Sequence, residues 1–403
     1  MDHDELLWRE AAVDRVLELR QTIVEDHPTE DVPLAEVGGR VLAASITAEA
    51  DAPPLSRATM DGFAINAGDE YPLTVREGEV FPEDDPGELG PGETRRVATG
   101  APIPSGADAV LKREEATVED GALTGPTLEA GTYVYERGRN YRAGETLFAA
   151  GERLGPRDAI LLGDMGLESV TVRTPFSVGV VATGTEIHEG RTRDLDSPML
   201  SGLVESWGHT ATYEGSAPDE YERVRDLLAE TAADHDVVVS TGGTSVGHKD
   251  HVVRALDELG DVLFHKVRIR PGKPIAVAHL PDQDAVAVAI PGKPIGAHVV
   301  ATFVMAPLFT GAGGPYPTVA AECSTDVGLG PEGFEYVIPV TLADGVAEPL
   351  GHVDSALSVY SDTFDPSVLS SSTRTTRADG VVCTTDPLTE GETVEVIPYD
   401  VLE

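Results

Sequence analysis

Between residues 175 and 312 the sequence alternates buried-type strands with amphipathic helices, and this alternation limits the possible folds more than any other feature. The run SVGVVAT at 177–183 has the length and apolar content of a buried strand. Strand-like runs follow at 237–239, 262–267, 275–280 and 285–290, and helical patterns occur at 198–207, 219–233, 251–259 and 294–308. Strands and helices that alternate along one segment predict a mainly parallel sheet with helices on both faces.

The segments on either side of this region carry short β-like runs broken by turn residues. The chain contains 42 Gly and 29 Pro, which is typical of many turns rather than long helices. We therefore expect β-rich modules over about 50–172 and a small β-barrel or sandwich over about 316–403. An N-terminal amphipathic helix, with Val13 and Val16 on its apolar face, should end at His27-Pro28. The expected fold class is α/β and multidomain.

The chain is strongly acidic, with 70 acidic residues against 29 basic ones and a formal net charge of −41. A nucleic-acid-binding surface needs cationic side chains to neutralise phosphates, so this balance excludes that class of partner. The acidic residues are spread along the chain and arginine is retained, a pattern that resembles cytoplasmic proteins of halophiles. Only five lysines occur, and four of them lie between 249 and 293, where we expect an anion-binding site.

Neither targeting signals nor reactive cysteines are predicted. No apolar run approaches the ~18–20 residues that a membrane-spanning helix needs. The N-terminal sequence MDHDELLWRE lacks the basic and apolar regions of a secretory signal. The two cysteines, Cys323 and Cys383, suggest neither a disulfide framework nor a metal cluster, and we expect them to be packing residues. These features predict a cytoplasmic protein without a membrane partner.

Residues suited to ligand binding follow the carboxyl ends of the expected strands, where open α/β sheets bind their ligands. Glu186 follows the strand expected at 177–183, Asp219 opens the helix expected at 219–233, and the stretch STGGTSVG follows the strand at 237–239. Cations and Pro-Gly turns follow the strands at 262–267 and 285–290. We expect these residues to converge on one edge of the sheet. The candidate binding residues are Thr183, Gly184, Glu186, Asp219, Ser240, Gly242, Gly243, Ser245, Asp250, Lys266, Arg270, Lys273, Pro291, Gly292, Lys293 and Pro294.

The chemistry of these residues indicates a site for an anion and a divalent cation. Backbone N–H groups of a glycine-rich turn and of a helix N-terminus favour negative charge. Lysine and arginine side chains would hold phosphates or an oxyanion, and Glu186, Asp219 and Asp250 could hold Mg²⁺, which prefers oxygen ligands. The sequence contains no dinucleotide fingerprint, Walker A loop or nucleophile elbow. A pyrophosphate or a dianionic oxometalate suits such a site.

Five motifs carry a resemblance to a known family over essentially the whole chain. They are RATMDGFA at 57–64, TGAPIPSGAD at 99–108, GRNYR at 138–142, STGGTSVG at 240–247 and PGKP at 271–274. With them the chain resembles the MoeA family, the molybdopterin molybdenumtransferases related to the E domain of gephyrin. It departs from the family pattern at Thr146 and Thr185, where the family has aspartate, and at Lys293, where the family has asparagine.

The resemblance implies four domains in an elongated dimer. Residues 1–50 and 146–174 would form domain I, which contributes to dimerisation, and residues 51–145 would form the β-rich domain II. Residues 175–312 would form domain III, an α/β domain like MogA and MoaB, and residues 316–403 would form domain IV, a β-barrel. In this arrangement the active site lies between domain III of one subunit and domains I and II of the other.

The resemblance also implies a reaction in which molybdate is inserted into adenylylated molybdopterin, releasing AMP and forming the molybdenum cofactor. It implies catalytic roles for Asp61, Thr99, Glu186, Asp219 and Asp250, with Mg²⁺ held by Glu186 and Asp250. The other candidate residues would bind the substrates. The expected protein partners are a second copy of the chain, a MogA/MoaB-type adenylyltransferase and the apoproteins of molybdoenzymes.

Three other functions are compatible with the sequence. The chain could adenylylate molybdopterin, since domain III shares its fold with adenylyltransferases, although that reaction would not need the segments around Asp61 and Thr99. It could insert tungstate in place of molybdate, or act as a non-catalytic molybdopterin-binding scaffold, as the gephyrin relationship permits. The retained Glu186, Asp250 and Lys273 favour an enzyme over a scaffold.

Overall fold

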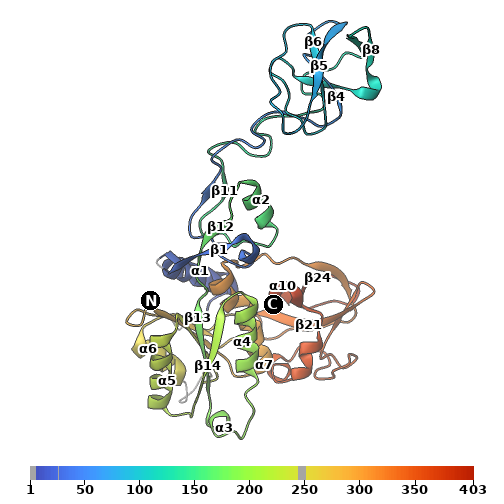
Figure 1. The fold of residues 1–403 in the computed structure, drawn as a ribbon. Coiled ribbons are helices and arrows are strands. Elements are labelled where there is room, and N and C mark those ends of the chain that lie inside the picture. Colours follow the sequence, from blue (N-terminus) through green and yellow to red (C-terminus); the bar gives the residue numbers. More distant parts are fainter. Residues whose placement is uncertain (1–5, 26, 244–250) are drawn as a thin grey trace. The chain divides into compact units, whose positions relative to one another are not determined.

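The computed structural model describes residues 6–25, 27–243 and 251–403 of the chain (Figure 1). The chain divides into two compact units. The first unit consists of Met1–Val41, Arg153–Ala159 and Ser169–Glu403, and the second unit consists of Leu42–Glu152 and Ile160–Glu168. The second unit is therefore inserted between segments of the first.

A six-stranded sheet lies at the centre of the first unit, in the order β14-β13-β15-β19-β18-β16. β14, β13, β15 and β19 are parallel, and β18 is antiparallel to both of its neighbours. A short turn at 281–284 joins β18 to β19, and so short a connection permits only antiparallel pairing. The prediction of a mainly parallel sheet is confirmed. The strands are β13 (Ser177–Thr183), β14 (Thr210–Ala217), β15 (Val237–Thr241), β16 (Asp261–His265), β18 (Ala276–Leu280) and β19 (Ala285–Ile290).

Helices cover both faces of this sheet, as its fully buried central strands β15 and β19 require. α4 (Asp196–Ser206) and α7 (Pro294–Val300) pack on one face, in the main hydrophobic core of the unit. α5 (Tyr221–Asp234) and α6 (His251–Leu259) pack on the other face in a second core. Figure 1 shows the two helix pairs on opposite sides of the sheet.

The N-terminal helix packs on the helical segment that follows β19. The helix expected at 294–308 consists of α7, a π-helical stretch at Ala301–Met305 and α8 (Ala306–Thr310). α1 (Arg9–Glu25) packs against the π-helical stretch and α8, and its residues Val13 and Val16 are buried. The predicted N-terminal helix is therefore confirmed. After α1, β1 (Thr29–Pro33) pairs with β12 (Ser169–Arg173).

The C-terminal part of the first unit is a closed five-stranded barrel. Each strand pairs with two others in the circular order β21-β22-β20-β24-β23, and β23 pairs again with β21. Tyr336, Ile338 and Phe364 fill the interior. The expected β-barrel is confirmed. Its elements are β20 (Val319–Cys323), β21 (Glu335–Ala343), β22 (Val346–Pro349), β23 (Gly380–Thr384) and β24 (Thr393–Pro398), with α9 (Pro366–Leu369), α10 (Tyr399–Leu402) and the added strand β17 (Ile269–Arg270).

The second unit is β-rich, as its short β-like runs predict. Its six-stranded sheet has the order β7-β4-β6-β5-β9-β8, and Phe63, Val97 and Leu111 are buried within it. The strands of the sheet are β4 (Gly62–Ile65), β5 (Leu73–Val80), β6 (Glu93–Val97), β7 (Ala109–Lys112), β8 (Thr117–Glu119) and β9 (Ala122–Thr124). Two further pairs join β2 (Ile46–Thr47) to β11 (Thr146–Phe148) and β3 (Arg57–Ala58) to β10 (Val134–Tyr135). α2 (Asp158–Asp164) contains residues of both units.

Candidate active site

A pocket of about 510 Å³ lies at the carboxyl edge of the central sheet. Loops that follow β13, β14, β15 and β19 line it, and we call it the strand-end pocket. These loops come from separate parts of the sequence, and the parallel strands bring them to the same edge. The predicted residues that line the pocket are Thr183, Gly184, Glu186, Asp219, Gly242, Gly243, Pro291, Gly292, Lys293 and Pro294.

Closely packed glycine turns form one wall of the strand-end pocket. Gly242 has a φ angle of 87°, and a Cβ atom there would lie 2.6 Å from the carbonyl oxygen of Thr183. A Cβ atom on Gly292 would lie 3.1 Å from the Cα atom of Gly242. The loops after β13, β15 and β19 can approach this closely because glycine has no side chain and tolerates a positive φ.

Two predicted carboxylates lie on the strand-end pocket. Glu186 is exposed on the short helix α3 (Thr185–His188), and Asp219 is half-buried just before α5. The backbone N–H of Asp219 donates to Oγ1 of Thr185 over 3.0 Å, and the N–H of Thr185 donates to Oδ2 of Asp219 over 3.3 Å. This reciprocal pairing holds Asp219 beside the segment that carries Glu186.

These carboxylates fit the ligand chemistry of Mg²⁺, which commonly uses one or two carboxylates together with substrate phosphates. Among the described residues, no three His, Cys, Asp or Glu side chains form a group that could hold a metal ion. Asp250 and Ser245, which the sequence also predicts here, lie outside the described residues.

Asp196 is a residue of the strand-end pocket that the sequence analysis missed. The residue is 6% exposed. Its Oδ2 accepts a hydrogen bond from Oγ1 of Thr241 over 2.9 Å, and its buried Oδ1 has no hydrogen-bond partner among the described residues. Burial raises the pKa of this carboxyl group to about 6. The sequence analysis expected this helix to begin at residue 198 and so left Asp196 outside it. In the structure α4 begins at Asp196, because Asp194 accepts hydrogen bonds from the N–H groups of Asp196 and Ser197. An aspartate in the first turn of a helix at the ligand-binding edge is the signal that could have identified this residue.

A second, cationic pocket of about 230 Å³ adjoins the strand-end pocket. The two share Pro274, Pro291 and Lys293 in their linings. Arg270 and Lys273 also line the cationic pocket, so three of the predicted cations lie together. Ser367 of α9 and Ser370, the residue after α9, also line this pocket; the sequence analysis had not identified them as site residues.

Contacts with neighbouring groups fix the positions of the cations in this pocket. The guanidinium carbon of Arg270 lies 4.2 Å from the centre of the Phe334 ring, and Nζ of Lys273 lies 5.8 Å from it. Nε of Arg270 is buried without a hydrogen-bond partner among the described residues. Lys293 donates from Nζ to the carbonyl oxygen of Ser367 over 2.8 Å. Fixed cations beside hydroxyl groups can bind a small oxyanion through charge-assisted hydrogen bonds.

Other predicted site residues lie outside these two pockets. Ser240 is buried within β15, and Lys266 follows β16 and donates its backbone N–H to Ile275. In the second unit, the backbone N–H and Oγ1 of Thr99 each lie 2.7 Å from Oδ1 of Asp61. These two hydrogen bonds from Thr99 lower the pKa of Asp61. The structure thus joins Asp61 and Thr99 as one polar group, although their motifs are separate in the sequence.

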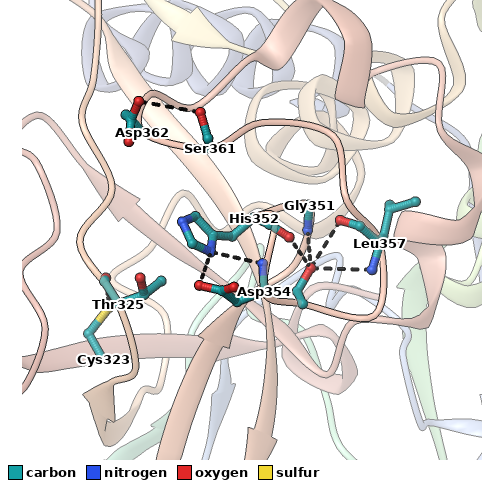
Figure 2. Close-up of polar contacts among 9 residues, drawn as sticks. Cys323, Thr325, Gly351, His352, Asp354, Leu357, Ser361 and Asp362 are labelled. Atoms are coloured by element: carbon teal, nitrogen blue, oxygen red, sulfur yellow. Dashed lines mark hydrogen bonds and ion pairs between the residues drawn. The ribbon is translucent and has the colours of Figure 1, made fainter.

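The cysteines do not form a second chemical site in the described part of the chain. Sγ of Cys323 donates to the carbonyl oxygen of Thr325 over 3.3 Å, and Nδ1 of His352 accepts a hydrogen bond from the backbone N–H of Asp354. Figure 2 draws these residues. Burial raises the pKa of the Cys323 thiol, and burial raises that of Cys383 to about 12. Both cysteines are free thiols. The prediction that they are packing residues is confirmed.

Helices of the described residues are all too short or too polar to cross a membrane. Comparison with protein families shows two matches. A model of the MoeA N-terminal region (domain I and II) matches residues 9–166, and a model of a probable molybdopterin-binding domain matches residues 179–310. The two models thus cover the second unit and the central sheet.

Individual relatives give the same result. A molybdopterin molybdenumtransferase of Synechococcus elongatus is 32% identical over 299 residues, which cover 69% of this chain and 74% of that protein. A molybdopterin molybdenumtransferase of Bacillus subtilis is 33% identical over 295 residues, which cover 67% of this chain and 67% of that protein. The crystal structure of the molybdopterin biosynthesis moeA protein from Pyrococcus horikoshii OT3 matches with a TM-score of 0.75 at 26% identity, over 98% of this chain and 100% of that chain. The chain therefore belongs to the MoeA family of molybdopterin molybdenumtransferases.

Proposed function

We propose that the protein inserts molybdenum into adenylylated molybdopterin, releasing AMP and forming the molybdenum cofactor. The observation that carries this proposal is the junction of the two pockets through Pro274, Pro291 and Lys293. The reaction needs a place for a small dianion next to a place for a larger phosphorylated substrate. The relatives named molybdopterin molybdenumtransferase support the same activity.

In this proposal, Arg270, Lys273 and Lys293 bind molybdate in the cationic pocket, where their charges offset those of the dianion. The strand-end pocket binds the pterin nucleotide, with the N–H groups of the Gly242-Gly243 turn available to its phosphates. Glu186 and Asp219, together with Asp250, hold Mg²⁺. When bound, the ion would offset the negative charge on the departing AMP.

We further propose that the protein is a homodimer in which Asp61 and Thr99 of one subunit act at the pockets of the other. The four-domain boundaries given above belong to this proposal. Light scattering should report a dimer, and a monomer at working concentration would contradict it. Co-expression of Asp61→Asn with Lys273→Ala tests the shared site, because mixed dimers would contain one site without either substitution. Activity that reappears in the mixture supports the proposal, and an inactive mixture contradicts it.

The acidic surface supports a further proposal, that the protein works in the cytoplasm of a salt-adapted cell, since −41 charges repel each other less in concentrated salt. A MogA/MoaB-type adenylyltransferase would supply the adenylylated substrate, and molybdoenzyme apoproteins would receive the product.

Incubation with adenylylated molybdopterin, Mg²⁺ and either molybdate or tungstate tests the main proposal. We expect AMP release that depends on the oxyanion, and faster release with one oxyanion identifies the preferred metal. Formation of pyrophosphate from ATP and molybdopterin would instead indicate an adenylyltransferase. Tight substrate binding without any AMP release would indicate a scaffold.

A further inference from the structure

A small cavity in the first unit lies apart from both pockets and shares no lining residue with them. Its volume is about 20 Å³. It lies where the C-terminal end of α1 meets the segment between β12 and β13 and the turn before β14. The charged and aromatic residues that line it are Arg20, His27, Arg40, Arg173, Phe176 and His209. None of the described lining residues is acidic, although the chain has 70 acidic residues.

Arg40 and Arg173, two of the arginines that line the cavity, already have partners within the protein. Arg40 forms an ion pair with Glu30. Arg173 donates to the carbonyl oxygens of His27, over 2.5 Å, and of Glu25, over 2.9 Å. These contacts close the end of α1, where unpaired carbonyl groups attract a cation. Arg40 and Arg173 therefore have structural roles that need no ligand.

Arg20 and Arg153 differ, because no carboxylate of the described residues forms an ion pair with either. Nε of Arg20 is buried, and no residue in the described part of the chain forms a hydrogen bond with it. Arg153 donates from Nη2 to the carbonyl oxygen of Trp207 over 2.9 Å. The same nitrogen lies 3.5 Å from a Cβ atom placed on Gly39, a residue of the cavity lining. Arg20 thus lines the cavity and Arg153 lies next to Gly39 of its lining, and neither pairs with a carboxylate of the described residues.

The two histidines cannot balance these arginines, because an imidazole ring is either neutral or positively charged. Nδ1 of His209 accepts a hydrogen bond from the backbone N–H of Phe176 over 2.9 Å, so this nitrogen is unprotonated. The other ring nitrogen lies 3.2 Å from the carbonyl oxygen of Phe309, to which it donates. Burial lowers the pKa of His209 to about 4, and the ring stacks on Phe176 with centroids 5.0 Å apart. His209 is therefore a neutral aromatic side chain in the lining of the cavity. His27 forms a hydrogen bond between its Nε2 and Oγ1 of Thr174.

Burial and mutual repulsion both disfavour the charged forms of Arg20 and Arg153. Burial lowers the pKa of both guanidinium groups, and the charge of Arg153 lowers that of Arg20 further. An anion between them would replace repulsion by attraction in surroundings that screen charge less than water does. A cavity of about 20 Å³ is only slightly larger than the ~10–15 Å³ that one water molecule needs. It is therefore suited to a monatomic anion and too small for a tetrahedral oxyanion such as molybdate.

We propose that this cavity binds one chloride ion, held by Arg20 and Arg153 against the rings of Phe176 and His209. The bound ion links the end of α1 to β12, β13 and the turn before β14, and so stabilises the first unit. This site is independent of the proposed enzymatic function, because none of its residues lines either substrate pocket.

Thermal unfolding at one fixed sodium concentration, with chloride exchanged stepwise for the larger anion gluconate, tests the site. The wild-type protein should melt at a temperature that rises with the logarithm of the chloride concentration, as expected for a ligand that binds only the folded state. Arg20→Gln and Arg153→Gln should lose most of this chloride dependence. Arg76→Gln, which removes an exposed arginine paired with Glu93 in the second unit, should keep all of it. This comparison of variants cancels anion effects that act on the whole surface.

A direct measurement on the wild-type protein covers the case in which the arginine variants do not fold. Crystals soaked in sodium bromide should show an anomalous scattering peak between Arg20 and Arg153, because bromide replaces chloride at such sites. Absence of this peak, or equal melting temperatures in chloride and gluconate, would overturn the proposal. Loss of the chloride effect in Arg76→Gln would do the same.

Discussion

At the level of single residues, Asp196 combines burial, one unpaired oxygen and a position on the strand-end pocket. Desolvation favours the protonated form in the folded protein, so its folded pKa of about 6 lies above the ordinary value of 3.8. Below the unfolded pKa both states carry the proton and the carboxyl group costs nothing. As the pH rises from 3.8 to about 6, the ionised group increasingly destabilises the fold.

Replacement of Asp196 by Asn should therefore stabilise the protein in a pH-dependent way. Asn resembles the protonated acid and can still accept the hydrogen bond from Thr241. A shift of about two pKa units at ~1.4 kcal/mol each predicts a gain on the order of 3 kcal/mol above pH ~7, shrinking towards zero near pH ~4. Urea unfolding of both proteins across this pH range measures it. A difference that does not change with pH would show that the carboxyl group is not perturbed by burial.

Lys273→Ala should weaken molybdate binding by about 10- to 100-fold, the range for a lost charge-assisted hydrogen bond of ~1.5–3 kcal/mol. Lys112→Ala is the matched control, since Lys112 lies in the second unit over the ring of Tyr133. Calorimetric titration with molybdate compares the two variants with the wild type. Unchanged affinity in Lys273→Ala would remove this lysine from the anion site.

The proposed Mg²⁺ site predicts that Glu186→Gln and Asp250→Asn release AMP at least ~10²-fold more slowly, the scale of one lost transition-state contact. Both variants should still bind the adenylylated substrate, because the Gly242-Gly243 turn that the proposal assigns to its phosphates is unchanged. Single-turnover assays over a range of Mg²⁺ concentrations, with chelator as the metal-free control, measure this effect. Normal rates at saturating Mg²⁺ would contradict the metal-holding role.

At the level of secondary-structure elements, the site depends on how closely the loops after β13, β15 and β19 pack. Gly242→Ala should lower the free energy of unfolding by about 2 kcal/mol or more, because a positive φ alone costs alanine roughly 1–2 kcal/mol and its Cβ would meet the Thr183 carbonyl oxygen. Gly202→Ala on the exposed face of α4 is the control. No atom lies within 4 Å of a Cβ there, so it should stabilise the helix by ~0.5–1 kcal/mol. Equal effects of the two substitutions would contradict the close-packing argument.

Element types were predictable here because hydrophobic periodicity is a local property of the sequence. The apolar run at 177–183 became β13, and the alternating region became a mainly parallel sheet. The start of α4 was placed too late, since capping by the Asp194 side chain depends on a loop conformation that the sequence pattern does not show. The π-helical stretch within 294–310 was also not predicted, because packing against α1 accompanies it and α1 is distant in sequence.

At the level of the whole molecule, the net charge of −41 should make stability depend on salt. The Debye length falls from ~10 Å at 0.1 M to ~3 Å at 1 M salt, which screens repulsion between the acidic side chains. The melting temperature should therefore rise between these concentrations. Sodium gluconate should produce this rise as well as sodium chloride, which separates general screening from the proposed chloride site. Equal melting temperatures at ~0.1 M and ~1 M gluconate would contradict the screening argument.

The sequence by itself determined the alternation of strands and helices, the β-rich character of the C-terminal segment and the clustering of ligand-binding residues after the strands. These follow from local periodicity and from the common edge at which parallel strands end, whereas the pattern left a barrel and a sandwich both open for the C-terminal segment. Only the tertiary structure decided which side chains share a cavity. Asp196 lines the strand-end pocket, Ser367 and Ser370 line the cationic pocket together with Lys273 and Lys293, and Arg20 lies beside Arg153. Such neighbours are distant in the chain, and their burial and charge environment depend on packing between elements, which no local pattern encodes.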